Sequence, residues 1–222
     1  MISSQRDFAV LGGSFDPVHQ GHISIAETIS ESLGARVCLV PVGVPAHKSS
    51  LVASPKQRLR MLELAIRNHP GLVVDDLELV RDSISYTFET MRILREKLGE
   101  SENLYFILGM DAYLDLPTWH EWQNLLNLTH IVVCHRVSAK AFPPELRVFE
   151  ANHRVRTIDE LKAASRGFVY YVDNPAVEIS SSEVRARLRR GDAMTGLINP
   201  EVARFISEQN LYRSTGDEGI PQ

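Results

Sequence analysis

The stretch GGSFDPVHQGH, Gly12 to His22, follows directly on the apolar run Phe8–Leu11. An apolar run that leads into two glycines, and then into a segment of helical period, is typical of a buried strand that turns into a helix. In open α/β sheets, ligands bind beyond the carboxyl ends of the strands, and glycines let the backbone approach a ligand closely. The stretch therefore predicts an α/β fold with a ligand site at this first turn.

His19 and His22 stand three residues apart at the predicted start of the helix, so both imidazoles can face one ligand. The first-turn N–H groups and the positive end of the helix dipole favour an anion such as phosphate at the same place. The local alternative is that the glycines only form a turn and that the histidines cap the helix or pack beside it. A single histidine more often has such a structural role, but the placement of both at a strand-to-helix turn favours ligand binding.

Two other kinds of site are disfavoured by the same residues. No Cys or carboxylate stands at an obvious spacing to give zinc a third ligand beside the two histidines. The stretch also departs from the GxGxxG pattern of dinucleotide-binding sites and from the lysine-containing phosphate loop. We therefore expect no metal held by the protein itself.

Short apolar runs alternate with segments of helical period along the rest of the chain, which predicts βαβ units and a mostly parallel sheet flanked by helices. The expected fold class is α/β, doubly wound and Rossmann-like, in a single domain over residues 1–213 with a flexible tail over 214–222. The predicted strands are Phe8–Leu11, Val37–Val42, Leu104–Leu108, Ile131–Cys134 and Phe168–Val172.

Helix signals are equally direct. Ser54, Pro55 and Gln57 form a capping box with proline at the first helical position, and His69–Gly71 stops that helix. Another helix is expected after His22, with Gly34 as its terminator. Segment 138–167 is polar and weakly periodic, which indicates a surface insertion or an irregular connection. Further helices are expected at Thr87–Leu98, Trp119–Leu126, Glu183–Arg190 and Pro200–Glu208.

Composition limits the partners. The 222 residues carry 24 Lys and Arg against 28 Asp and Glu, a net charge of −4, which disfavours a broad electrostatic contact with nucleic acid or an anionic membrane.

No apolar stretch approaches the roughly 20 residues that span a bilayer, and residues 1–6 lack a signal-peptide core, so a cytoplasmic protein is expected. Cys38 and Cys134 lie in apolar runs and are expected to be buried free thiols. The sequence predicts no oligomeric state.

Two later segments allow a local and a functional interpretation. Ser180 and Glu183 have the spacing of a capping box, and Arg185–Arg190 could form a solvated helix face. The same segment would also point serine hydroxyls, helix N–H groups and Arg185 at an anion, as a second phosphate clamp facing the first. Asp111 follows the predicted strand Leu104–Leu108, where a carboxylate suits ribose hydroxyls or caps a helix.

The stretch GGSFDPVHQGH resembles the (H/T)xGH phosphate-binding motif of the nucleotidylyltransferase superfamily. More narrowly, the chain is similar to the bacterial nicotinate-nucleotide adenylyltransferases over about Phe8 to Arg213. The resemblance continues through VPVGVPAHKSS, SYTFET, FILGMDAYLDLPTWHEW, HIVVCHR, ISSSEVRARL and FISEQNLYR. It implies an enzyme whose substrates are ATP and nicotinate mononucleotide, with Mg²⁺ carried by the ATP phosphates. Pantetheine-phosphate and glycerol-phosphate nucleotidyltransferases have a similar first motif, and a non-catalytic nucleotide sensor is the remaining alternative.

The resemblance also implies residue roles. His19, His22, Lys48 and Arg185 are the expected catalytic residues. Thr87 is expected near the nicotinate carboxylate, although it could simply cap the following helix. Residues implied in ATP binding are Gly12, Gly13, Ser14, Phe15, His19, His22, Gly109, Asp111, Ile179, Ser181, Ser182 and Arg185, and those implied in mononucleotide binding are Lys48, Thr87, Trp119, His120 and Arg136.

Trp119 is expected to stack on the pyridinium ring, while core packing is the expected role of the other tryptophan in Trp119–Trp122. Lys48 and Arg136 are candidates for the mononucleotide phosphate, or ordinary surface charges. Three positions depart from the usual family residues. Ser182 replaces a threonine and keeps the hydroxyl, Ala46 replaces a proline, and His120 replaces a tyrosine.

Overall fold

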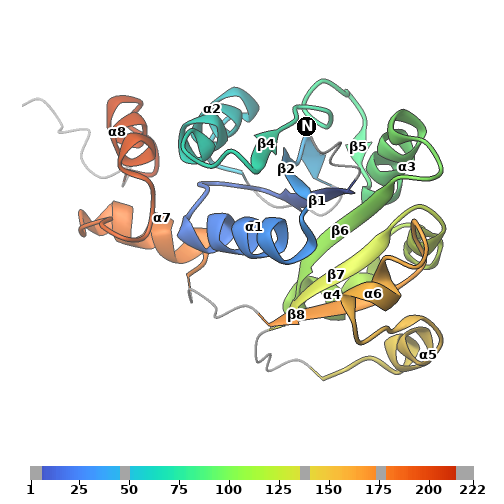
Figure 1. Cartoon of the computed structure of the whole chain (residues 1–222). Coiled ribbons are helices and arrows are strands. Elements are labelled where there is room, and N and C mark those ends of the chain that lie inside the picture. Colours follow the sequence, from blue (N-terminus) through green and yellow to red (C-terminus); the bar gives the residue numbers. More distant parts are fainter. Residues whose placement is uncertain (1–6, 46–50, 136–140, 174–178, 214–222) are drawn as a thin grey trace, which may run out of the picture.

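The computed structural model describes residues 7–45, 51–135, 141–173 and 179–213. A six-stranded sheet forms the centre of the molecule, in the order β4-β2-β1-β6-β7-β8, and every neighbouring pair is parallel (Figure 1). The α/β prediction with a mostly parallel sheet is therefore confirmed. The strands are β1 (Asp7–Gly13), β2 (Arg36–Pro41), β4 (Leu72–Val74), β6 (Asn103–Gly109), β7 (His130–His135) and β8 (Val169–Asp173).

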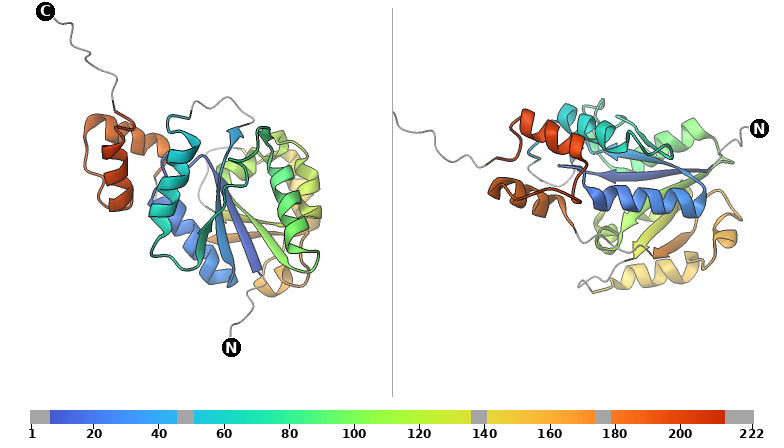
Figure 2. Two further views of the ribbon diagram at one scale, coloured as in Figure 1. Left: turned by 90° about the horizontal axis from the view of Figure 1, so that it is seen from above. Right: turned by 60° about the vertical axis from the view of Figure 1, so that its left-hand side comes forward.

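Helices cover both faces of this sheet (Figure 2). Alternate residues of each strand point to opposite faces, so Ala9 and Leu11 of β1 belong to one core cluster and Val10 belongs to the other. The first cluster includes apolar residues of α1 (Gln20–Leu33), α2 (Pro55–Ile66), α7 (Ser181–Arg190) and α8 (Pro200–Glu208). The second includes residues of α3 (Thr87–Leu98), α4 (Met110–Leu114) and α5 (Pro144–His153). Burial on both faces explains why the strands read as continuous apolar runs.

The strand order reverses next to β1. From β1 the chain continues outward through β2 and β4, whereas β6, β7 and β8 lie on the other side of β1. Connections that leave two adjacent parallel strands in opposite directions open a crevice at their carboxyl ends. That crevice lies beyond Gly13 of β1 and Gly109 of β6.

Most predicted helix ends are found. Ser54 Oγ accepts a hydrogen bond from Gln57 N at 3.3 Å, and Gln57 Oε1 accepts one from Ser54 N at 2.9 Å, which completes the predicted capping box of α2. Gly34 ends α1 in the left-handed conformation, with φ of 63°. α3 and α8 have the predicted bounds. α1 begins earlier than expected, at Gln20, because His19 itself is the N-cap residue.

Two predictions about local structure are wrong, and three short strands were missed. The expected helix Trp119–Leu126 is instead two 3₁₀ helices, η1 (Leu116–Thr118) and η2 (Trp122–Asn127), and Trp119 between them is extended. The described part of segment 138–167 contains α5 and α6 (Ile158–Leu161), which escaped notice because each buries one leucine and so has little apolar periodicity. Three further short strands were not predicted, namely β4 and the parallel pair β3 (Val44–Pro45) and β5 (Ile84–Ser85).

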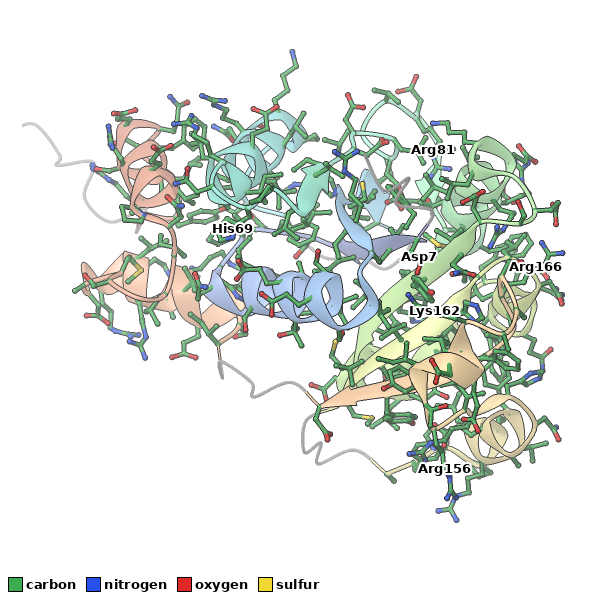
Figure 3. All side chains as sticks on the ribbon, in the orientation of Figure 1. Asp7, His69, Arg81, Arg156, Lys162 and Arg166 are labelled. Atoms are coloured by element: carbon green, nitrogen blue, oxygen red, sulfur yellow. The ribbon has the colours of Figure 1, made fainter. Side chains whose placement is uncertain are left out.

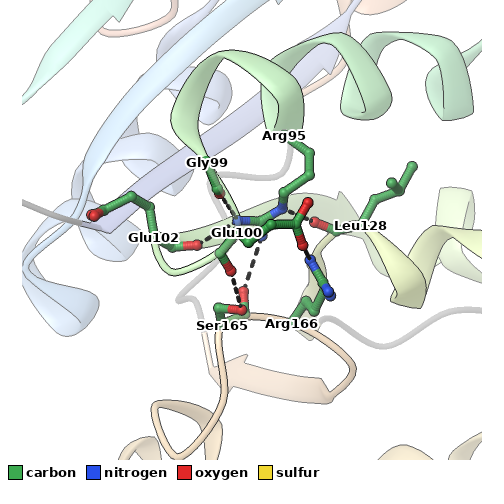
Figure 4. A network of polar contacts seen from close by, with 7 residues as sticks. All are labelled: Arg95, Gly99, Glu100, Glu102, Leu128, Ser165 and Arg166. Carbon is green, nitrogen blue, oxygen red and sulfur yellow. Dashed lines mark hydrogen bonds and ion pairs between the residues drawn. The ribbon is translucent and has the colours of Figure 1, made fainter.

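Polar contacts tie the elements together at the amino ends of the strands. Arg95 is buried, and its guanidinium donates to the carbonyl oxygens of Leu128, Gly99, Glu102 and Ser165 at 2.7 to 3.1 Å (Figure 4). Lys162 pairs with Asp7 at 2.7 Å at the same edge (Figure 3). Such contacts join the elements at the amino ends of the strands. The predicted ligand-binding residues lie at the opposite, carboxyl ends. In the part of the chain that the structure describes, no helix is long and apolar enough to cross a membrane.

Candidate active site

The carboxyl ends of β1 and β6 border a cavity of about 670 Å³. Gly12, Gly13 and Ser14 line it from the end of β1, and Gly109 lines it from the end of β6. Thr87, Trp119 and His120 line the same cavity. The structure thus brings together residues predicted for both substrates, although they come from three separate parts of the sequence.

The glycines at this edge differ in what surrounds them. A Cβ atom on Gly13 would stand 3.2 Å from the ring of Phe15, so this glycine makes room for a buried side chain of the first motif. A Cβ atom on Gly109 would meet nothing within 4 Å. Gly109 therefore leaves free space in the cavity that the protein does not fill.

The two histidines of the first motif lie against each other. Their ring centroids are 3.7 Å apart, and the planes are inclined by 30°. The backbone N–H of His19 donates to Nδ1 of His22 at 3.2 Å. A neutral imidazole has one acceptor and one donor nitrogen, so this bond leaves the proton of His22 on Nε2, where it can be donated to a ligand.

Both rings are neutral near pH 7. Burial lowers the pKa of His19 to about 4. Burial, and to a smaller extent the neighbouring His19, hold the pKa of His22 well below its ordinary value. The histidines can therefore act as hydrogen-bond donors to phosphate without a positive charge in the free protein.

Gly21, between the two histidines, has a packing role that the sequence analysis missed. A Cβ atom there would stand 3.1 Å from His19 Nδ1 and 3.1 Å from Ile179 Cγ2. The close approach of Ile179 brings the segment of the second motif against the first histidine. A side chain at the third position of the HxGH pattern would therefore crowd both neighbours.

The second motif contacts the first one directly. Ser181 Oγ donates to the carbonyl oxygen of Pro17 at 3.0 Å, and Arg185 Nη1 donates to that of Asp16 at 2.6 Å. A further bond of 3.2 Å joins Arg185 Nη2 to Ser182 Oγ. Ser180 caps α7 as expected, since its hydroxyl accepts from Glu183 N at 3.2 Å.

A buried arginine holds the backbone beside the site by hydrogen bonds, and it was not predicted from the sequence. Arg58 of α2 has no exposed surface and donates to the carbonyl oxygens of Ser14 at 2.9 Å and Val42 at 2.7 Å. Burial lowers its pKa, and the carboxylate of Asp16 opposes that shift. The only sequence signal is an arginine within the otherwise apolar stripe of α2.

The two tryptophans differ in their relation to the cavity. Trp119 is half-buried and lines the cavity, with its ring 6.2 Å from that of Phe106. Trp122 packs on Phe149 at 5.1 Å instead. The exposed ring of His120 lies 4.4 Å from that of Tyr86. Both indoles pack against the same core cluster, and of the two only that of Trp119 also lines the cavity.

Other predicted site residues lie outside the described ranges, away from the cavity lining, or in a different local role. Lys48 and Arg136 lie outside the described residues. Asp111 is in the first turn of α4 and is not among the residues that line the cavity, while Gly109 is the N-cap residue there. Tyr86, not Thr87, is the N-cap residue of α3, so Thr87 is free of a capping role.

The histidine pair is set apart from this cavity. His19 lines a second cavity of about 470 Å³, between α1, α2 and the segment before α8, and His22 lines neither cavity. Among the described residues, no group of three or more His, Cys, Asp or Glu side chains could hold a metal ion.

Comparison with known proteins agrees with this geometry. The model of the cytidylyltransferase-like family matches residues 10–187, so the chain belongs to that family. A relative from Yersinia pestis (strain Pestoides F), named a probable nicotinate-nucleotide adenylyltransferase, is 38% identical over 93% of this chain and 95% of its own. One of the same name from Aeromonas hydrophila subsp. hydrophila is 40% identical over 92% and 96%. Within the family, the chain belongs with the nicotinate-nucleotide adenylyltransferases.

Solved structures show the same fold. The nicotinic acid mononucleotide adenylyltransferase of Plasmodium falciparum, complexed with NaAD, superposes with a TM-score of 0.71 at 23% identity, over 93% of this chain and 97% of that one. A putative nicotinate-nucleotide adenylyltransferase from Vibrio parahaemolyticus gives a TM-score of 0.62 at 16% identity, over 94% and 96%. The doubly wound α/β architecture is thus shared over nearly the whole of each chain.

Proposed function

We propose that this protein joins nicotinate mononucleotide to the adenylyl part of ATP and releases pyrophosphate. The observation that carries the proposal is the direct contact between the two predicted phosphate motifs, through Arg185 and Asp16 at 2.6 Å and Ser181 and Pro17 at 3.0 Å. This contact brings the N-terminus of α7 against the turn before α1, whose N-cap residue is His19. Such an arrangement suits a polyphosphate, because each element offers N–H donors or positive charge.

The reaction we propose is a direct displacement. An oxygen of the mononucleotide 5′-phosphate attacks the α-phosphorus of ATP, and the bond from that phosphorus to the bridging oxygen of pyrophosphate breaks in line. No protein nucleophile takes part. The protein positions the two substrates and stabilises the negative charge that spreads over the non-bridging oxygens.

His22 is proposed to donate its Nε2 proton to a phosphate oxygen of ATP, with His19 beside it. Arg185 adds a positive charge, and α1 and α7 add the positive ends of their dipoles. Lys48 is proposed to hold a phosphate as well. The divalent ion is proposed to enter with the substrate, as MgATP.

The mononucleotide is proposed to occupy the cavity of about 670 Å³. Trp119 would stack on the pyridinium ring, and Thr87 would donate its hydroxyl and backbone N–H at the start of α3 to the nicotinate carboxylate. His120 and Arg136 are the remaining proposed contacts. A carboxylate suits the positive end of the α3 dipole better than a neutral amide does, which favours nicotinate over nicotinamide.

The proposal is tested by incubating the purified protein with MgATP and nicotinate mononucleotide, and measuring dinucleotide and pyrophosphate. We expect the two products in equal amounts, and a higher kcat/KM for nicotinate mononucleotide than for nicotinamide mononucleotide. Nucleotide binding without release of pyrophosphate would instead support a non-catalytic sensor. Turnover with another phosphorylated small molecule, but not with the pyridine nucleotide, would overturn the substrate assignment.

A further inference from the structure

Asp16, the aspartate of the first motif, is buried and accepts three hydrogen bonds. Its Oδ2 accepts from the backbone N of Val52 at 2.7 Å, and its Oδ1 accepts from that of Ala53 at 3.0 Å. The third donor is the phenol of Tyr212, at 2.6 Å from Oδ1. The carboxylate therefore joins the turn before α1 both to the residues that lead into α2 and to the end of the described chain.

Tyr212 is held firmly in this position. Only 4% of its surface is exposed, and it belongs to the core cluster that contains α1, α2 and α8. Burial, followed by the bond to Asp16, raises its pKa, so the phenol stays protonated and remains a donor. Its φ of 60° lies in the left-handed region, which costs free energy in a residue other than glycine and persists only where the surroundings impose it.

The backbone at Asp16 and at the next residue carries contacts to the second motif. The carbonyl oxygen of Asp16 accepts from Arg185, and that of the next residue, Pro17, accepts from Ser181. His19 follows two residues later as the N-cap residue of α1. A shift of the Asp16 side chain would consequently move both phosphate motifs relative to each other.

We propose that Tyr212 is a positioning residue for adenylyl transfer. Through its hydrogen bond to Asp16, the phenol fixes the turn that leads into His19 and His22 and that accepts the hydrogen bond from Arg185. Tyr212 touches no substrate in this scheme and acts on the reaction only through the placement of that turn. The inference rests on the proposed function. It gives a role to Tyr212, a residue that follows α8 and belongs to neither phosphate motif.

The test is Tyr212→Phe, which removes only the hydroxyl. A misplacement of about 1 Å in a catalytic group can cost on the order of 100-fold in rate, so we expect kcat to fall by at least about tenfold. We expect the KM for nicotinate mononucleotide to change little, because neither Asp16 nor Tyr212 is among the residues that line the cavity with Trp119 and Thr87. The matched control is Tyr105→Phe, because the Tyr105 hydroxyl also bonds an aspartate, Asp7, at 3.4 Å, at the amino edge of the sheet. This variant should keep the wild-type kcat.

A second measurement needs no turnover. Hydrogen exchange of the Val52 and Ala53 amides should speed up in Tyr212→Phe, since both donate to the carboxylate that loses its third donor. The double variant with Asp16→Asn should be no slower in turnover than Asp16→Asn alone if Tyr212 acts through Asp16.

Three results would overturn the inference: a kcat of Tyr212→Phe within twofold of wild type, an equal loss in Tyr105→Phe, or unchanged exchange at both amides. Absence of turnover in the wild-type protein contradicts the proposed function instead. The two failures are therefore distinguishable.

Discussion

The backbone amide of His19 donates to Nδ1 of His22 at 3.2 Å, and this bond determines which nitrogen of His22 can serve a ligand. The N-cap residue of α1 uses its own N–H to select the tautomer of a side chain one turn later. Because Nδ1 is occupied as an acceptor, Nε2 carries the proton. The two histidines thus form a unit in which one orients the other.

This relationship predicts different outcomes for two amide substitutions of His22. Asparagine can place its oxygen near the position of Nδ1 and keep the bond to His19 N, but it lacks a donor at the position of Nε2. We expect His22→Asn to keep the urea stability of wild type and to lose about 10²- to 10³-fold in turnover, as for the removal of one donor to a developing charge. Glutamine reaches the Nε2 position, so His22→Gln should retain more activity. Equal activity in the asparagine variant and the wild type would exclude donation by Nε2.

The lowered histidine pKa values predict a loss of stability in acid. A pKa of about 4 for His19 in the folded protein, against an ordinary value of 6.5, means that the unfolded chain binds the proton first as the pH falls. The stabilisation of the folded state by the neutral His19 is complete above pH 6.5 and is lost as the pH falls toward 4. Between pH 7.5 and 5.0 we expect one such group to remove about 2 kcal/mol from the free energy of unfolding.

His130 provides the control for this effect. It is also fully buried with a pKa of about 4, but it starts β7 at the amino edge of the sheet, where Nε2 bonds the carbonyl oxygen of Ala164 at 3.0 Å. His19→Gln and His130→Gln should each reduce the difference in unfolding free energy between the two pH values, measured by urea titration. Only the His19 variant should also lose turnover. A pH difference unchanged in His19→Gln would show that this residue ionises normally in the folded state.

Stacking by Trp119 predicts a selective effect on one substrate. Trp119→Ala removes an indole from the cavity and should raise the KM for nicotinate mononucleotide about fivefold or more, since cation–π contact contributes about 1 kcal/mol or more. The KM for MgATP should change less. Trp122→Ala is the matched variant, because that indole packs on Phe149 and should affect stability instead. A similar rise in KM from both variants would indicate a general loosening of η1 and η2.

Much of the fold was predictable because the strands of a doubly covered sheet are apolar on both faces and helix ends carry local signals. Ser54, Gly34 and Gly99 each mark an end by their own chemistry, and their neighbours in sequence suffice to show it. β4 and α5 carry too few buried residues for a pattern to emerge.

The residues of the site also differ in how far the sequence alone can reveal them. The two phosphate motifs could be found locally because each is a strand-to-helix or loop-to-helix turn with its donors in one short stretch. The bond between Asp16 and Tyr212 joins residues 196 positions apart, and Arg58 reaches the site from the middle of an ordinary helix. The partners of Tyr212 and Arg58 lie far away in the sequence, so only the folded chain shows their part in the site.

Gly109 gives a test of whether the cavity beyond β6 holds substrate. A methyl group there would meet no protein atom within 4 Å, and φ of −71° suits any residue, so Gly109→Ala should leave the unfolding free energy unchanged. If a substrate fills the cavity, the methyl group occupies part of its space, and the KM for MgATP or for nicotinate mononucleotide should rise. Comparison of the two KM values shows which substrate approaches β6, and the assignment of Gly109 to ATP requires the rise for MgATP. Wild-type values for both substrates, in a variant of unchanged stability, would mean that neither substrate passes close to the carboxyl end of β6.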